Sequence, residues 1–322
     1  MTLRKLFAAL AAVALLQMSA DVPAQAYPVK SIRLIAPYPP GGGVDAVARV
    51  VAAFLSTNLG QQIVVDNRPG ASGRIGTELV AKAAPDGYTL LLGSVGPNAI
   101  IPATYPRLSY GAKDFAPISL VATADYILVV HPSLPVKSTK DLISLAKAHP
   151  GVINFGSTGH MGGPHLAGEL FKLLAKVDMV HIAYKGGAPS VIAILTGETA
   201  TAFGSPPTVM PYVKTGKLRA IASTGPKRST ASPSLPALSE TLPGLEVTQW
   251  WGLLAPAGTA DPVAQRLQSE IAKVASDAAF RKQLENLGAD VTTNSSNEFA
   301  DHIVREIEKW TRVVTAAGLL EK

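Results

Sequence analysis

The sequence predicts an α/β fold with two lobes, each built on a mostly parallel sheet with helices on both faces. Short apolar runs alternate with amphipathic segments in both halves of the chain, which is typical of β–α–β units. Glycine-rich turns follow strands in both halves, at residues 41–43 and 156–163. Two long strand-like stretches, near residues 118–131 and 245–256, would carry the chain between the lobes. We therefore expect lobe 1 to hold residues 27–124 and 250–322, and lobe 2 to hold residues 125–249.

The first 26 residues are expected to be a signal peptide. Arg4 and Lys5 precede an apolar run from Leu6 to Leu16, and Ala24-Gln25-Ala26 fits the small-residue rule for cleavage. The apolar run is too short to span a bilayer as a stable helix. The sequence thus predicts a secreted, periplasmic protein whose mature chain starts at Tyr27.

Composition excludes several classes of protein. The chain has 322 residues, no cysteine and a formal charge of +6. Without cysteine it has no disulfide framework and no lipid-attachment motif. The basic residues are spread thinly and are not interleaved with aromatic ones, so we do not expect nucleic-acid binding.

The first lobe opens with a strand, a glycine turn and a helix. Ile32 to Ala36 is a run of strand formers that ends at Pro37, because proline cannot donate to a sheet. Gly41 to Gly43 allows a tight turn and a close approach of backbone to a ligand. The helix that follows ends near Gly60. Its one apolar face is formed by Val47, Val50, Val51, Phe54 and Leu55. Further strands are expected at 62–66 and 88–92, with a helix at about 75–83.

The second lobe repeats this alternation. Ser138 is a candidate N-cap for a helix that ends at Pro150-Gly151, and proline in the first turn favours a helix from Pro164 to Lys176. Strands are expected at 152–155, 179–184, 199–203 and 218–223, a helix around 191–195, and a loop over 226–243. After the second crossover stretch, two amphipathic helices would complete lobe 1, one from Asp261 and one around residues 299–310.

Several polar residues follow strands, where ligands of α/β proteins gather. Ser157, Thr158 and His160 precede a helix start that suits a carboxylate, although loop serines and threonines also bond their own backbone. Ser94 ends a strand, where site residues collect, but its position is nearly as consistent with an ordinary loop serine as with a ligand-binding one. Tyr184 and Lys185 follow another strand, but most lysines are solvated.

Two acidic residues are ambiguous. Asp45 is four residues before Arg49 at a helix start, which favours a role in ordering the loop over direct ligand contact. His165 and Glu169 are also four apart, but HExxH is absent and no third ligand is apparent, so no metal site is expected.

Trp250 and Trp251 alternate across a strand, and a core or hinge role is favoured over ligand stacking.

Six segments together resemble the Bug family, the periplasmic receptors of tripartite tricarboxylate transporters. In chain order they read YPVKSIRLIAPYPPGGGVDAVAR, VVDNRPGASGRIG, DGYTLLLGS, INFGSTGHMGGPHLAGELF, YKGGAPSVIAILTGE and GKLRAIASTG. The resemblance implies a type II periplasmic-binding fold, a small carboxylate held between the lobes, and a membrane permease as partner. It also implies a monomer without a cofactor.

By position, the resemblance implies that the ligand is gripped by the loops Tyr38–Asp45 and Ser157–His165. The binding residues it suggests, with those above, are Tyr38, Pro40, Gly41, Gly42, Asp45, Ser94, Ser157, Thr158, Gly159, His160, Gly162, His165, Tyr184 and Ser205.

The chain departs from the family pattern at five positions. Val44 and Gly162 stand where a hydroxyl residue is usual, Met161 where a small residue is usual, and Ala200 and Gly204 where an aspartate is usual. The ligand's identity is therefore left open, including whether it is a simple dicarboxylate.

The leading interpretation is a receptor that closes on a small organic acid, or its amide, and delivers it to a permease. A secreted hydrolase that uses Ser157 or Ser94 in the same cleft is an alternative, but G-x-S-x-G and G-x-x-x-x-G-K-[ST] are absent. A sensory receptor that hands its closed form to a membrane sensor is a third possibility.

Overall fold

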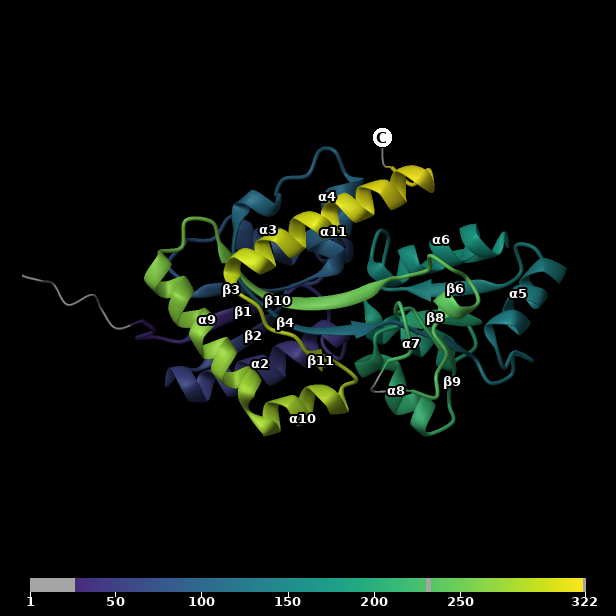
Figure 1. Ribbon diagram of the computed structural model, residues 1–322, viewed down its shortest axis with the longest axis horizontal. Coiled ribbons are helices and arrows are strands. Elements are labelled where there is room, and N and C mark those ends of the chain that lie inside the picture. Colours follow the sequence, from purple (N-terminus) through teal and green to yellow (C-terminus); the bar gives the residue numbers. More distant parts are fainter. Residues whose placement is uncertain (1–26, 230–232, 321–322) are drawn as a thin grey trace, which may run out of the picture.

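The protein is described by a computed structural model over residues 27–229 and 233–320. The expected signal peptide, residues 1–26, lies outside the described residues. Two lobes lie side by side, each around one sheet (Figure 1). In the described chain, lobe 1 holds a six-stranded sheet in the order β11-β4-β10-β3-β1-β2, and lobe 2 a five-stranded sheet in the order β7-β6-β8-β5-β9. The two-lobed α/β fold is confirmed.

Lobe 1 combines the start and the end of the chain. Its strands are β1 (Ile32–Ala36), β2 (Ile63–Asn67), β3 (Thr89–Ser94), β4 (Phe115–Asp125), β10 (Thr248–Pro256) and β11 (Asp290–Val291). Its helices are α2 (Gly43–Leu59), η1 (Ala71–Gly73), α3 (Arg74–Ala81), the π-helical turn η2 (Gly96–Ile100), α4 (Ile101–Thr104), η3 (Ala112–Asp114), α9 (Asp261–Ser276), α10 (Ala278–Asn286) and α11 (Ser296–Ala316).

Lobe 2 is formed by the middle of the chain. Its strands are β5 (Ile127–Val130), β6 (Asn154–Ser157), β7 (Val180–Ala183), β8 (Thr201–Gly204) and β9 (Arg219–Ser223). Its helices are α5 (Thr139–Ala148), α6 (Gly163–Ala175), α7 (Gly187–Leu195), α8 (Pro206–Lys214) and η4 (Leu238–Glu240).

The crossover strands give both sheets a mixed character. β1 runs parallel to β2 and β3, and β6 runs parallel to β7 and β8. The antiparallel pairs among the described strands all involve β4, β5 or β10. β4 and β10 pair along most of their length, and β5 starts two residues after β4 ends. The chain therefore passes between the lobes on paired strands.

Helix α8 does not follow from the sequence pattern, because three prolines lie within it. Pro206 and Pro207 occupy its first turn, where a missing N–H does no harm. Pro211 lies inside the helix. A Ser-Pro pair at residues 205–206 was the available start signal, since serine is a good N-cap and proline a good first helical residue.

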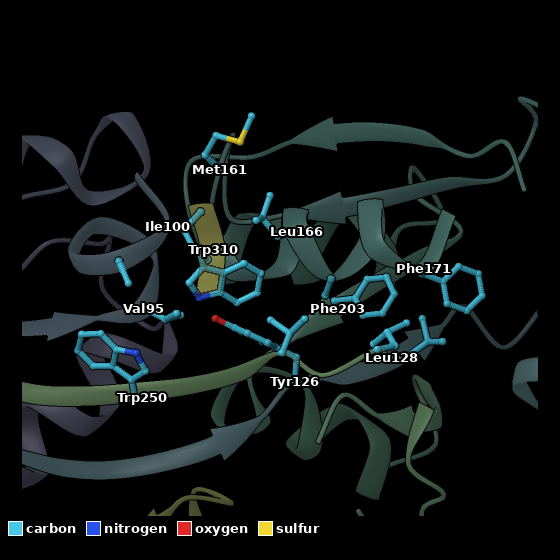
Figure 2. Close-up of a cluster of buried hydrophobic side chains, with 14 of the residues drawn as sticks. Val95, Ile100, Tyr126, Leu128, Met161, Leu166, Phe171, Phe203, Trp250 and Trp310 are labelled. Atoms are coloured by element: carbon cyan, nitrogen blue, oxygen red, sulfur yellow. The ribbon is translucent and has the colours of Figure 1, made fainter. Parts of the chain in front are cut away.

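Apolar packing continues from one lobe into the other. A single buried cluster contains Ile100 and Trp310 from lobe 1 together with Met161, Leu166 and Phe203 from lobe 2 (Figure 2). Helix α11 lies beside α4 and the π-helical turn η2 (Figure 1). In the described chain, no helix is both long and apolar enough to cross a membrane.

Candidate functional site

A cleft lies between the two lobes, and residues from both line it. The cavity volume is about 40 Å³, so the lobes are close together. Its lining residues are Tyr38, Gly42, Gly43, Val44, Ser94, Gly96, Tyr126, Thr158, Gly163, Pro164, Gly187, Ser205, Gln249 and Trp251. The described lining contains no charged side chain. Any charge on a ligand must therefore be balanced by dipoles and hydrogen bonds.

Helices α2, α6 and α7 begin at this cleft. The first residue of each is a glycine that lines it: Gly43, Gly163 and Gly187. In the described structure, none of these helix starts is capped by a side chain. First-turn N–H groups have no partner within their own helix, and each helix end carries roughly half a positive charge. The cleft is thus built to attract an anion.

Hydroxyl groups and aromatic rings complete the lining. Ser94, Thr158 and Ser205 bring hydroxyls to it from the strand β3, from the loop after β6 and from the start of α8. The Tyr38 hydroxyl donates to the backbone oxygen of Ser72 at 2.9 Å, and the Tyr126 hydroxyl donates to the side-chain oxygen of Gln249. Burial raises the pKa of Tyr38 and of Tyr126, so both remain neutral donors.

Asp45 stabilises the first glycine loop from behind. Its carboxylate accepts the Gly41 N–H at 2.9 Å and the Asn67 side-chain amide at 3.0 Å, and it pairs with Arg49 at 3.0 Å. Burial alone would raise the pKa of Asp45, but the hydrogen bonds from Arg49, Gly41 and Asn67 lower it below the ordinary value. An ionised Asp45 therefore orders the loop, and it is not among the residues that line the cleft.

Contacts between the lobes close the edge of the cleft. The Ser72 hydroxyl donates to the backbone oxygen of His160 at 2.6 Å. A β-carbon placed on Gly43 would lie 2.5 Å from Oγ of Ser205. One placed on Gly186 would lie 2.7 Å from the ring of Pro39. Glycine at these two positions allows the lobes to approach this closely.

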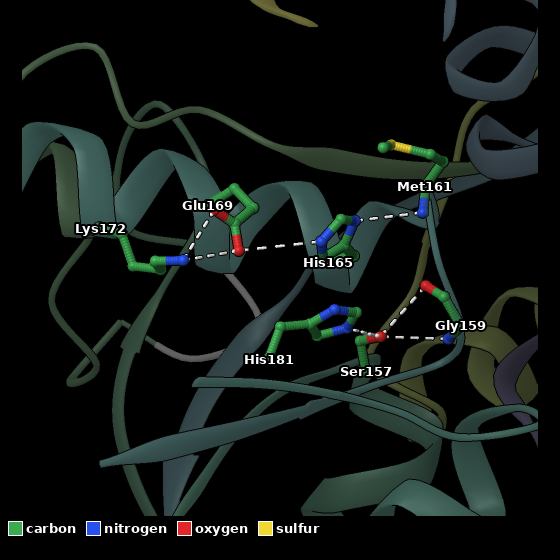
Figure 3. Close-up of polar contacts among 7 residues, drawn as sticks. All are labelled: Ser157, Gly159, Met161, His165, Glu169, Lys172 and His181. Atoms are coloured by element: carbon green, nitrogen blue, oxygen red, sulfur yellow. Dashed lines mark hydrogen bonds and ion pairs between the residues drawn. The ribbon is translucent and has the colours of Figure 1, made fainter. Parts of the chain in front are cut away.

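The Ser157 side chain contacts Gly159 and His181 in Figure 3, and Ser157 is not among the described residues that line the cleft. Its hydroxyl donates to the Gly159 carbonyl and accepts the Gly159 N–H, both at 3.1 Å. It also lies 2.7 Å from Nε2 of His181. These bonds hold the turn that presents Thr158 to the cleft.

The structure supplies the third imidazole that the sequence pattern did not reveal. His160, His165 and His181 place ligand atoms within 4.8 Å of one another. The His165 and His181 rings stack at 3.9 Å, and Nδ1 of His165 accepts the Met161 N–H at 3.1 Å (Figure 3). With His181 bonded to Ser157, two of the three imidazoles already serve to fix the loop.

Burial keeps two histidines of this cluster, His165 and His181, neutral. Desolvation is the largest cause that lowers the pKa of His165 to about 3. Electrostatic interactions with His181, His160 and Lys172 lower it further. Desolvation, followed by His160 and Lys172, lowers the pKa of His181 to about 4. Glu169 is paired with Lys172 at 3.0 Å and lies 3.8 Å from His165. At neutral pH His165 and His181 are therefore hydrogen-bonding groups without charge.

The predicted site residues separate into two groups. Those that line the cleft are Tyr38, Gly42, Ser94, Thr158 and Ser205. The others lie in or beside the same loops but outside the lining, namely Pro40, Gly41, Asp45, Ser157, Gly159, His160, Gly162, His165 and Tyr184. The Tyr184 hydroxyl donates to Glu198 at 2.8 Å, away from the cleft.

The sequence reasoning missed two cleft residues at the lobe crossings, Tyr126 and Gln249, and favoured a core or hinge role over ligand contact for Trp251, although Trp251 lines the cleft. Tyr126 lies between β4 and β5, and Gln249 and Trp251 lie on β10. These residues are far apart in the sequence and come together only when the chain folds. Their position at the two lobe crossings was the available signal, because ligand sites favour such interfaces. Gly187 was likewise identifiable as a glycine just before an apolar helix.

Comparison with known proteins gives the family. The model for the tripartite tricarboxylate transporter family receptor matches residues 47–319. The protein BugT of Bordetella pertussis is 36% identical over 304 residues, which cover 94% of this chain and 93% of BugT.

Two solved structures are also similar along nearly the whole chain. R. palustris Rpa4515 with adipate is 33% identical, with a TM-score of 0.88 and coverage of 91% of this chain and 98% of that one. MatC (Rpa3494) from Rhodopseudomonas palustris, with bound malate, is 30% identical, with a TM-score of 0.85 and coverage of 89% and 100%. The chain therefore belongs to the tripartite tricarboxylate transporter receptor family, a family of periplasmic solute-binding proteins.

Proposed function

We propose that this receptor binds a small organic carboxylate at the starts of helices α2, α6 and α7, and that the lobes close around it. The observation that carries this proposal is the set of uncapped glycine starts, Gly43, Gly163 and Gly187, in a described lining that has no charged side chain. Helix starts of this kind bind anions through backbone N–H groups. The two similar structures hold adipate and malate, which are small organic carboxylates.

Hydroxyl groups are expected to supplement the backbone donors. Ser94 and Tyr38 come from lobe 1, and Thr158 and Ser205 come from lobe 2, so the ligand would be held from both sides. The tighter contacts of the closed state stabilise that state relative to the open one. The transporter's permease is the expected acceptor of the closed receptor.

The hinge is proposed to lie where the paired crossover strands leave lobe 1. This places the boundaries near Asp125 and Gln249, with residues 27–124 and 250–322 in lobe 1. Tyr126 donates to Gln249 here, so the two connections are linked and would bend together.

The same cleft is not proposed to be an enzyme site. Ser157 lies beside His181, as a nucleophile and its base would. Yet Ser157 is bonded to both polar groups of Gly159 and is absent from the described lining, and burial lowers the pKa of His181 to about 4, which makes it a weak base. Ester or amide turnover lost in Ser157→Ala would contradict this proposal.

A thermal-shift screen of the mature chain from Tyr27 tests the proposal. The panel is adipate, malate, citrate, benzoate and hexanoate, with their amides as uncharged controls. A ligand at a hundred times its dissociation constant should stabilise the protein by about 2.7 kcal/mol. We expect stabilisation by acids and weaker or no stabilisation by the matched amides. Stabilisation by the amides alone, or by none of the compounds, would contradict an anion site.

A further inference from the structure

Two adjacent tryptophans on β10 differ in what surrounds their N–H groups. Trp250 and Trp251 are 1% and 0% exposed. In the described structure, Nε1 of each is buried and has no hydrogen-bond partner. Trp250 packs against Phe299 and His302, with ring centres 5.7 and 5.4 Å away, whereas Trp251 lines the ligand cleft.

An unpaired N–H buried in a protein is unfavourable, because it has given up its bond to water. A ligand in the cleft could provide an acceptor for Trp251. Trp250 packs in the apolar cluster that also holds Phe299, and neither of these two residues lines the cleft. The adjacent position is therefore a matched control for the effect of losing an indole N–H.

The position of Trp251 is close to the proposed anion site. Its Cζ2 lies 3.6 Å from the position of a β-carbon on Gly43, the first residue of α2. Oγ of Ser205 is 2.5 Å from that same position. In the indole ring, Cζ2 and Nε1 are both bonded to Cε2. The N–H therefore belongs to the ring edge that reaches the starts of α2 and α8.

The three helix starts offer more positive partial charge than one carboxylate balances. Helices α2, α6 and α7 together supply roughly one and a half positive charges at the cleft. A monocarboxylate carries one negative charge and would leave part of this positive charge unbalanced. A ligand with a second acceptor oxygen would be stabilised by the remainder.

We propose that Trp251 selects the ligand by donating its indole N–H to a second acceptor oxygen, so that the receptor prefers acids that carry a second carboxylate or a carbonyl group. This inference rests on the proposed carboxylate site. Trp251→Phe would keep an aromatic wall and remove the donor. A difunctional acid would then bury an oxygen without its partner, while a monofunctional acid would lose little.

The test compares acids that differ in one end group. Adipate is paired with hexanoate, and malate is paired with 2-hydroxybutyrate, and their affinities are measured by calorimetry for the wild type, Trp251→Phe and Trp250→Phe. We expect Trp251→Phe to weaken the bound diacid by about 10- to 100-fold and its monoacid partner by less than about threefold. Trp250→Phe should change neither by more than about threefold.

A second readout follows the proton itself. The chain has three tryptophans, so a 1H–15N correlation NMR spectrum shows three indole N–H signals. The signal that is missing from the spectrum of Trp251→Phe is that of Trp251. The diacid should shift this signal further downfield than the monoacid does. This measurement does not depend on how the variant binds.

The outcomes separate this inference from the proposed function. Equal losses for the diacid and the monoacid in Trp251→Phe, or tighter wild-type binding of the monoacid, would overturn the role of Trp251 alone. Failure of the folded wild type to bind any of the four acids would overturn the carboxylate site and this inference with it.

Discussion

The hydroxyl of Ser72 in lobe 1 donates a 2.6 Å hydrogen bond to the backbone oxygen of His160 in lobe 2. Both residues lie on loops: Ser72 has a left-handed backbone, with φ 56°, and His160 lies in the glycine-rich loop after β6. The bond exists only while the lobes are together. It therefore belongs to the free energy of closure and not to the stability of either lobe.

Ser72→Ala should weaken ligand binding. Loss of one exposed hydrogen bond costs the closed state about 0.5–1.5 kcal/mol, which is about 2- to 12-fold in affinity. Calorimetry with the best acid from the screen measures this change, and the unfolding midpoint should stay the same. Ser276→Ala is the control, because Ser276 is an exposed helix serine that bonds its own helix. An unchanged affinity in Ser72→Ala would show that this contact does not contribute to closure.

Gly43→Ala should obstruct closure without disturbing lobe 1. Its β-carbon would lie 2.5 Å from Oγ of Ser205 across the cleft. Overpacking of this kind costs about 1–3 kcal/mol, or about 5- to 150-fold in affinity. Small-angle scattering should show that the variant keeps the larger, open radius when ligand is added.

Removing the opposing side chain should restore closure. The double variant Gly43→Ala with Ser205→Gly is expected to recover compactness on ligand addition. Gly111→Ala is the control, because a β-carbon there meets nothing within 4 Å. If Ser205→Gly gives no recovery, the loss in Gly43→Ala arises at the helix start and not from a clash between the lobes.

The sequence was informative where structure is local. The apolar spacing from Val47 to Leu55 predicted α2, and the glycines at 41–43 predicted the turn before it. The family and the receptor function, which the six segments suggested, are confirmed. Each of these signals lies within a short stretch of chain, so periodicity and motif order are enough to read it.

Contacts that depend on register could not be predicted. His181 reaches Ser157 because β6 and β7 align Phe155 with His181 and Ser157 with Ala183. Nothing in the spacing of residues 157 and 181 sets that register. Tyr126 and Gln249 meet for the same reason, through the pairing of β4 with β10. The lining of the cleft is a property of these pairings.

Ser94 and Ser157 form a matched pair of buried serines, with exposures of 2% and 1%. Ser94 lines the cleft, whereas Ser157 is bonded to Gly159 and His181. Ser94→Ala should weaken acid binding by about 2- to 12-fold and leave the stability nearly unchanged. Ser157→Ala should lower the free energy of unfolding by about 1–3 kcal/mol, because it leaves buried partners unpaired.

Urea unfolding and calorimetry on both variants test this contrast. We expect Ser157→Ala to lower the affinity less than Ser94→Ala does, since Ser157 is not in the cleft lining and acts on the ligand only through the turn that presents Thr158. The reverse pattern, with affinity lost in Ser157→Ala and stability lost in Ser94→Ala, would exchange the roles assigned to the two serines.

The histidine cluster should make the protein less stable in weak acid. The pKa values of His165 and His181 are lowered to about 3 and about 4, first by burial and then by neighbouring positive groups. In the unfolded chain a histidine titrates near 6.5, so the unfolded state binds more protons below that pH. The stabilising effect is complete above about pH 6.5 and is lost progressively as the pH falls toward the folded values.

His165→Asn isolates this effect, because an asparagine oxygen can accept the Met161 N–H but does not titrate. Between pH 7 and pH 5, one such histidine accounts for about 2 kcal/mol of lost stability. The free energy of unfolding of His165→Asn should therefore fall by about 2 kcal/mol less than that of the wild type over this range. His149→Asn, at an exposed position, is the control and should follow the wild type. A slope in His165→Asn equal to the wild-type slope would mean that His165 takes up its proton while the protein is still folded.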